Sequence, residues 1–131
     1  MFLFVSYGAT LIMLSAFKSL EIFLPALHSI ERAMGGDKWM HFTLSAFLSI
    51  LACFASGRVL DLAALKRAAY VYVVLFMALS LDEMMQYTLA SRRFELLDLA
   101  YGSLGLLIGV LGYLSAIVVR RAKHRVRKYH V

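Results

Sequence analysis

Several ionisable side chains in this sequence stand inside or beside strongly apolar stretches, where a charge is costly. Charged groups in such surroundings tend to pair with one another, to face the inside of a helix bundle and to serve a function. Carboxylates and imidazole can transfer protons, hold a cation or accept hydrogen bonds, whereas Lys and Arg bind anionic oxygens. The candidate ligand-binding residues are Asp37, Lys38, His41, Asp82, Glu83, Gln86, Arg92 and Asp98.

Asp82 and Glu83 are adjacent carboxyls within an apolar segment. Two such groups do not both stay ionised without cationic or hydrogen-bonding partners, which Lys38, Arg92 or Arg93 could supply. One interpretation is a site for proton handling, for a cation or for a polar head group. The other is a salt-bridge cluster that only fixes helix packing.

His41, Asp82 and Glu83 are the candidate catalytic residues, for acid–base chemistry. A divalent metal held by these three residues and Asp98 is chemically conceivable. However, no spacing matches HExxH or a Cys/His zinc pattern, so we predict no metal, and the sequence specifies no cofactor. Ser45 lies one helical turn from His41 on the same predicted helix, which is a poor geometry for nucleophilic attack.

The composition indicates a membrane protein. Of 131 residues, 62% are hydrophobic and 17% are charged, and the mean hydropathy is +0.76. Soluble domains are usually about a quarter charged. Four apolar segments are long enough to cross a hydrocarbon core roughly 30 Å thick. They cover residues 2–24, 38–56, 68–89 and 96–119. We therefore predict a single all-α domain, a membrane bundle of four transmembrane helices.

The first segment could instead be a cleaved signal peptide. However, no basic residue precedes its apolar run, and Lys18 and Glu21 stand where a small-residue cleavage site is expected. These two residues are close enough along a helix to pair.

The basic residues predict the orientation. With both termini in the cytoplasm, nine basic residues lie in cytoplasmic segments and four in outer segments, in agreement with the positive-inside rule. Six of the nine lie in the tail, residues 120–131. A basic cluster can bind nucleic acid. Here it follows an apolar run, so we expect contact with anionic lipid and no nucleic-acid partner.

Helical spacing predicts that polar faces of three helices meet near the outer surface. Lys38, His41, Ser45 and Ser49 share one side of the second segment, within about 80°. On the third segment Asp82 and Gln86 are one turn apart. A stripe of small residues below Asp98 would let another helix approach closely. That stripe consists of Gly102, Gly105, Gly109 and Gly112. We expect a shallow pocket open to the outside, although Asp37 could simply cap its helix and Lys38 could reach the interface.

Two motifs resemble those of VanZ-like membrane proteins. Residues 37–42 read DKWMHF, similar to the family's DKxxHF helix entrance, and residues 82–87 read DEMMQY, similar to DExxQ with an aromatic. Arg92, Asp98 and Gly105 follow at the spacing of that family, so the resemblance covers residues 37–112. Gly102 stands where the family often has Asn, and Ala90 and Ser91 replace a Pro-Gly pair.

The resemblance implies a role in the bacterial cell envelope. The founding VanZ-like proteins are associated with reduced susceptibility to a glycopeptide antibiotic, and other members accompany exopolysaccharide or cell-envelope synthesis. It therefore implies a multi-pass protein of the bacterial inner membrane that binds a polar or anionic lipid-linked group at the outer interface. An enzyme acting on such a lipid and a structural subunit are the alternatives. Its expected partners are the bilayer, a lipid-linked glycan, other envelope-synthesis membrane proteins or a second copy.

Overall fold

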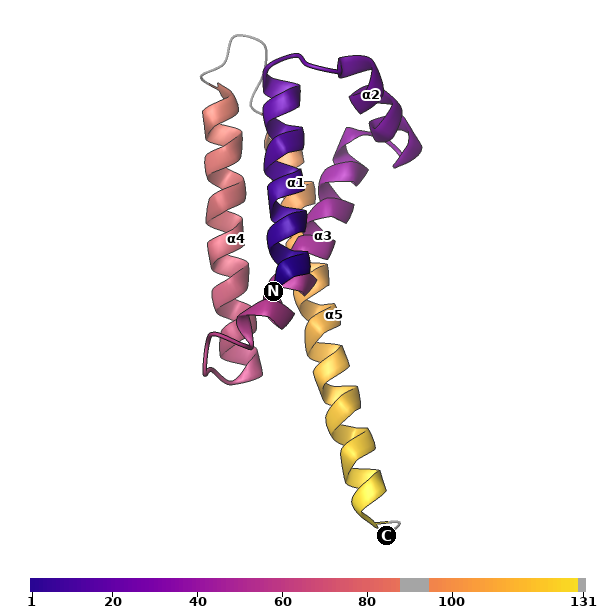
Figure 1. The fold of residues 1–131 in the computed structure, drawn as a ribbon, viewed down its shortest axis with the longest axis vertical. Helices are drawn as coiled ribbons and strands as arrows, with labels where there is room; N and C mark the ends of the chain where they lie inside the picture. Colours follow the sequence, from indigo (N-terminus) through magenta and orange to yellow (C-terminus); the bar gives the residue numbers. More distant parts are fainter. Residues whose placement is uncertain (88–94, 130–131) are drawn as a thin grey trace.

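The chain is all-helical in the computed structural model, which describes residues 1–87 and 95–129. Within these ranges there are five helices and no strand, which confirms the predicted all-α class, although the prediction was of four helices (Figure 1). The helices are α1 (Phe2–Ser19), α2 (Leu24–Ala33), α3 (Asp37–Ser56), α4 (Ala64–Tyr87) and α5 (Leu96–Tyr129).

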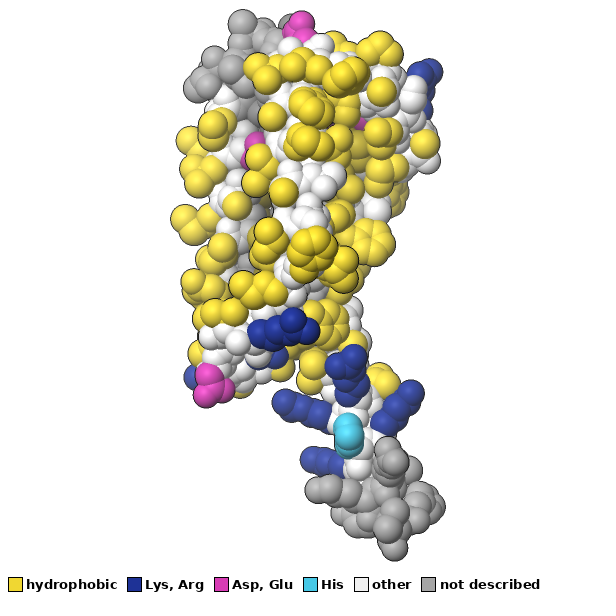
Figure 2. All heavy atoms as spheres, viewed as in Figure 1, with side chains coloured by type: hydrophobic (Ala, Val, Ile, Leu, Met, Phe, Trp, Pro, Cys, Tyr) yellow, Lys and Arg dark blue, Asp and Glu magenta, His cyan; other side chains and the backbone are white. Residues whose placement is uncertain are grey.

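Three of the helices are long and apolar enough to cross a membrane. Their candidate spans are Asp37–Ser56, Ala64–Met85 and Leu96–Arg125. Large apolar side chains on these helices point away from the protein, among them Phe47, Val73 and Ile108, each more than half exposed. Hydrophobic side chains cover most of the face in Figure 2 above the basic lower end. A lipid environment accounts for this exposure, because water would not tolerate so large an apolar surface.

The first segment forms a shorter helix than predicted. The sequence predicted a span over residues 2–24, but α1 ends at Ser19 and its apolar part is Phe2–Lys18. Glu21 and Phe23 adopt positive φ angles of 58° and 57°, which stop the helix and redirect the chain. At 1.5 Å per residue α1 is about 27 Å long, slightly less than a hydrocarbon core.

Helix α2 occupies a stretch that was predicted to be a polar connection. Pro25 lies in its first turn, where a missing N–H costs nothing. Leu27 and Glu31, one turn apart, are buried on a single face of α2. This short helix therefore forms because it can pack one side against the protein, although it is too polar to register as a span.

The closest helix contact joins α3 and α5. A Cβ atom added at Gly105 would overlap the backbone of Phe42, and one at Gly109 would overlap Ser49 Oγ and the backbone of Ala46. Ser49 is fully buried there. Because glycine has no side chain, the two backbones can lie nearly in contact, as small residues allow in membrane bundles.

A small apolar core joins α3, α4 and α5 toward the other end of the bundle. It contains Cys53 from α3, Ala68 and Val71 from α4, and Val110 and Tyr113 from α5. Helix α5 continues well past this core. Its 34 residues give a length of about 51 Å, so its basic end extends beyond a 30 Å hydrocarbon layer (Figure 1). The sequence predicted that this span stops near residue 119, but the helix runs on through the tail.

Candidate functional site

The starts of α3 and α5 bring the first group of predicted site residues together. Asp37 and Lys38 lie in the first turn of α3, His41 one turn later, and Asp98 in the first turn of α5. The close α3–α5 contact at Gly105 lies two turns below Asp98, so the polar ends of the two helices are held side by side. We call the ionisable residues gathered here the polar cluster: Lys18, Glu31, Asp37, Lys38, His41, Glu95 and Asp98.

His41 lies between two carboxylates of the polar cluster. Its Nε2 atom is 3.7 Å from Asp37 Oδ1 and 4.0 Å from Asp98 Oδ2, and its side chain is only 17% exposed. Nε2 is buried and accepts or donates no hydrogen bond within the described part of the chain. A movement of under about 1 Å would bring the imidazole within hydrogen-bond distance of either carboxylate. The three side chains can therefore rearrange together.

Two lysines neutralise the carboxylates. Lys18 Nζ lies 2.7 Å from Asp37 Oδ1 and 2.8 Å from Glu31 Oε1. The sequence had suggested that Lys18 pairs with Glu21. That pairing was wrong, because Glu21 follows the end of α1 in a left-handed conformation and Lys18 points to α2 and α3.

The second lysine also bridges two carboxylates. Lys38 Nζ lies 2.9 Å from Glu95 Oε2 and 3.4 Å from Asp98 Oδ1. The sequence had offered Lys38 as a partner for Asp82 or Glu83, but its ion pairs are with the start of α5 instead. The N-cap of α3 is Gly36 and not Asp37, which lies in the first turn with its carboxylate paired to Lys18.

The described charges of the polar cluster are unbalanced. Four carboxylates, those of Glu31, Asp37, Glu95 and Asp98, face two ammonium groups and two imidazoles, those of His28 and His41, among the described residues. Carboxylates only accept hydrogen bonds when ionised, so the surplus favours a ligand that donates hydrogen bonds or carries positive charge. Arg92 and Arg93, predicted contributors of positive charge, lie outside the described residues.

Three members of the cluster could also hold a divalent cation. One ligand atom each from Asp37, His41 and Asp98 can lie within 4.8 Å of the other two. Carboxylate oxygen and imidazole nitrogen suit several divalent metals. This set differs from the one considered from the sequence, since Asp37 takes the place of Asp82 and Glu83. Both aspartates already contact an ammonium group, which a bound metal would have to displace or tolerate.

The acidic pair of α4 is placed differently. Asp82 accepts a hydrogen bond from Ser15 Oγ of α1, at 3.0 Å to Oδ1 and 3.3 Å to Oδ2. Glu83 is almost fully buried at 1% exposure. The ion pairs of His41 involve Asp37 and Asp98, not these two residues. The Gln86 side chain lies outside the described residues.

Lys18, Glu31, Glu95 and Ser15 were not among the predicted site residues. A signal was present for Lys18, an ionisable residue at the end of an apolar helix, and for Glu31, which lies one turn after Leu27. No local pattern indicates that Ser15 meets Asp82, because the two residues are far apart in sequence and meet only through the packing of α1 near α4.

The chain matches no protein-family model, no curated protein and no solved structure. The resemblance of residues 37–112 to VanZ-like proteins therefore stays a prediction.

Proposed function

We propose that this chain is a membrane-bound binding protein that holds a hydroxyl-rich polar head group, such as that of a lipid-linked glycan, at one membrane interface. The observation that carries the proposal is the convergence of Asp37, His41 and Asp98 from two helices into one group within 4.8 Å. Charged side chains at such a position are energetically costly in a membrane. They therefore commonly mark a functional site.

The surplus of carboxylates supports a sugar rather than a simple anion as the contacted part. Ionised Asp37 and Asp98 can accept hydrogen bonds from hydroxyls, and each such charge-assisted bond is stronger than a neutral one. Lys38 is the most exposed cation of the cluster, at 35% for its side chain. It is therefore the residue that would meet a phosphate linking the sugar to its lipid.

The surroundings of the cluster support a position at the interface. Trp39 is 53% exposed, next to Lys38, and its ring packs edge-on against Tyr101 with centroids 5.9 Å apart. Trp and Tyr concentrate where a bilayer meets water. A head group would thus reach the cluster from the aqueous side while its lipid chain stays in the membrane.

The biological setting follows from the VanZ-like resemblance. In this proposal the protein is an accessory component of cell-envelope or exopolysaccharide synthesis in the bacterial inner membrane. Helix α1 crosses as a fourth span, both termini are cytoplasmic and the polar cluster faces outward. The basic residues near the α4 start and the α5 end support this orientation.

An enzyme is the second candidate, and the environment of His41 favours it. The His41 imidazole lies 3.7 Å from Asp37 Oδ1 and 4.0 Å from Asp98 Oδ2, and His with neighbouring carboxylates is a common acid–base combination in enzymes. Such a group could act as a general acid or base on a lipid-linked substrate. The residues in this version are His41, Asp37 and Asp98, in place of His41 with Asp82 and Glu83.

The test measures binding by purified protein in neutral detergent, using native mass spectrometry with a lipid-linked disaccharide diphosphate as the probe. We expect Asp98→Asn to weaken binding by about tenfold, the effect of one lost charge-assisted hydrogen bond. Asp61→Asn is the matched control, because Asp61 is exposed between α3 and α4. Equal affinities for the two variants would refute the binding proposal.

His41→Gln separates the two candidates. A binding protein should lose affinity in this variant in step with Asp98→Asn and should release no product from the probe. If the wild-type protein converts the probe and His41→Gln binds it normally without converting it, the enzyme candidate is correct. Circular dichroism of each variant checks that the helices remain formed.

A further inference from the structure

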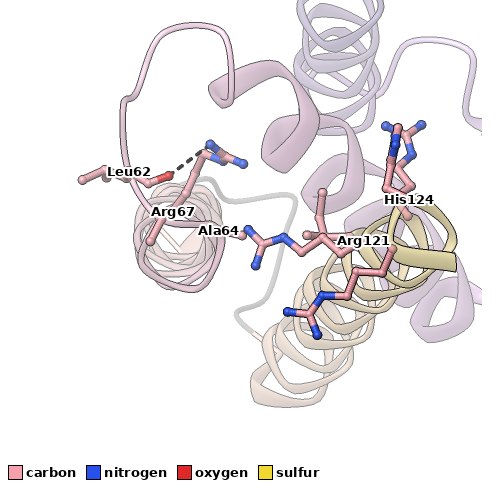
Figure 3. Close-up of a pocket in the computed structure, with 9 residues that line it drawn as sticks. Leu62, Ala64, Arg67, Arg121 and His124 are labelled. Atoms are coloured by element: carbon pink, nitrogen blue, oxygen red, sulfur yellow. Dashed lines mark hydrogen bonds between the residues drawn. The ribbon is translucent and has the colours of Figure 1, made fainter. Parts of the chain in front are cut away.

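A second polar site lies at the opposite end of α5 and shares no residue with the polar cluster. It is a cavity of about 570 Å³ between the start of α4 and the basic end of α5 (Figure 3). Four arginines and one histidine line it, and none of the described lining residues is acidic. The lining residues are Leu62, Ala63, Ala64, Arg67, Ile117, Arg120, Arg121, His124 and Arg125. We call it the basic pocket.

Packing fixes two of the arginines in the basic pocket. Arg67 donates one hydrogen bond from Nη1 to the Leu62 carbonyl oxygen at 3.2 Å and another from Nη2 to the Tyr113 hydroxyl. Its guanidinium lies 5.7 Å from the centroid of the Tyr113 ring, and that of Arg120 lies 5.9 Å from the Phe54 ring. These contacts hold positive charge in place before any ligand arrives, which lowers the ordering cost of binding.

Other basic side chains of the pocket are exposed and can contact a ligand. Arg121 and Arg125 are exposed, and Figure 3 shows Arg121 reaching from α5 toward Ala64 at the start of α4. The Nε atom of Arg67 is buried and has no hydrogen-bond partner within the described residues. A pocket with fixed and free guanidinium groups suits a group with several anionic oxygens, since Arg binds phosphate through paired N–H donors.

The position of the basic pocket along α4 and α5 indicates the source of its anionic ligand. Ile117 and Arg120 are about one turn apart on α5, where the apolar stretch gives way to the basic one. Leu62, Ala63 and Ala64 add apolar surface from the α4 side. The pocket thus lies at the end of the membrane-crossing part of the molecule, with apolar walls beside its charged ones. Basic side chains gather at this end, below the hydrophobic face (Figure 2).

We propose that the basic pocket binds the phosphate of an anionic membrane lipid, with Arg67 and Arg121 holding its oxygens from α4 and α5. This site is independent of the polar cluster and of the function proposed for it. It is more specific than general attraction of a basic tail to an anionic surface, because it depends on particular guanidinium positions and not on total charge.

The experiment compares two variants that remove one positive charge from neighbouring positions of α5. Arg121 lines the pocket, whereas Lys123 is exposed two residues later and does not. Purified full-length protein in neutral detergent is titrated with short-chain phosphatidylglycerol, and bound lipid is counted by native mass spectrometry. We expect Arg121→Gln to weaken binding by about tenfold and Lys123→Gln by less than about twofold.

Further arms test the source of the phosphate and the integrity of the fold. Glycerol phosphate, the soluble headgroup, should bind at least about tenfold more weakly than phosphatidylglycerol, because it cannot use the apolar walls. Thermal unfolding monitored by circular dichroism should be the same for both variants. Equal loss in Arg121→Gln and Lys123→Gln would overturn the pocket in favour of diffuse attraction. Equal binding of glycerol phosphate and the lipid would overturn the lipid assignment. If neither compound bound, the basic pocket would not be a phosphate site at all.

Discussion

At the scale of single residues, the polar cluster depends on lysines that neutralise buried and half-buried acids. Lys18 contacts Glu31 and Asp37, whose side chains are 10% and 32% exposed. Removing the cation from a buried or half-buried carboxylate destabilises the folded protein, because the carboxylate has already given up part of its hydration. The cluster is therefore part of the fold as well as a candidate site.

Replacing Lys18 by Met tests this coupling. We expect Lys18→Met to lower the free energy of unfolding by about 1–2 kcal/mol, between the values for exposed and fully buried ion pairs. Thermal denaturation in detergent, followed by circular dichroism, measures the change. Lys66→Met, at an exposed position of α4, should have little effect.

Adding Glu31→Gln to Lys18→Met should recover part of the lost stability, because the uncompensated carboxylate is removed together with its cation. If the double variant is as unstable as the sum of the single ones, Lys18 and Glu31 are not coupled, and Lys18 stabilises the protein through its ion pair with Asp37 instead.

Sequence patterns identify several members of this cluster but not their pairings. The helical spacing of Lys38 and His41, and the charge of Asp98 in an apolar helix, predict that these residues face inward. The partners of Lys18 and Lys38 come from other helices, and helix periodicity contains no information about those contacts. Asp82 and Glu83 were grouped with His41 because they are charged and at a similar depth, although Asp82 bonds to Ser15 on α1.

At the scale of helices, the close contact of α3 with α5 sets the position of the site. The contact depends on the absence of a side chain at Gly105, where a Cβ atom would overlap the Phe42 backbone. Backbone atoms cannot move aside as the end of a flexible side chain can. Any side chain at this position must therefore push the two helices apart.

Gly105→Ala should destabilise the protein by about 1–3 kcal/mol, the usual effect of overpacking a tight contact. Gly112→Ala is the matched control, because the nearest atom to its added Cβ is Ile50 Cδ1 at 3.9 Å. The control should be neutral or slightly stabilising, since Ala favours helix over Gly. Thermal unfolding measures both. Similar losses in the two variants would mean that the loss in Gly105→Ala does not come from the contact with the Phe42 backbone.

The helix boundaries follow from sequence only where hydropathy decides them. The predicted segment 38–56 corresponds closely to α3, because its apolar run is flanked by Gly36 and Gly57. Helix α2 was not predicted, since a ten-residue helix with one packed face has too little apolar character to stand out. The extension of α5 through residues 120–129 was also missed, because a charged run can be helical once a long helix has already been nucleated.

At the scale of the whole molecule, the two proposed sites lie at opposite ends of α5. Asp98 and Arg121 are separated by about 35 Å of helix at 1.5 Å per residue, slightly more than a hydrocarbon core. In a membrane the polar cluster and the basic pocket would therefore meet different aqueous compartments. A glycan-bearing head group and an anionic lipid phosphate would be bound in opposite leaflets.

Cysteine labelling in intact cells tests this arrangement with few changes, because Cys53 is the only native cysteine and is fully buried. Ser29 on α2 is exposed beside the polar cluster, and Asp61 is exposed near the basic pocket. A membrane-impermeant maleimide should label Ser29→Cys in intact cells but should label Asp61→Cys only after the membrane is opened. Labelling of both positions in intact cells would contradict a membrane-crossing α3. Labelling of Asp61→Cys alone would reverse the orientation, and the polar cluster would then face the cytoplasm, where a lipid-linked precursor is built rather than received.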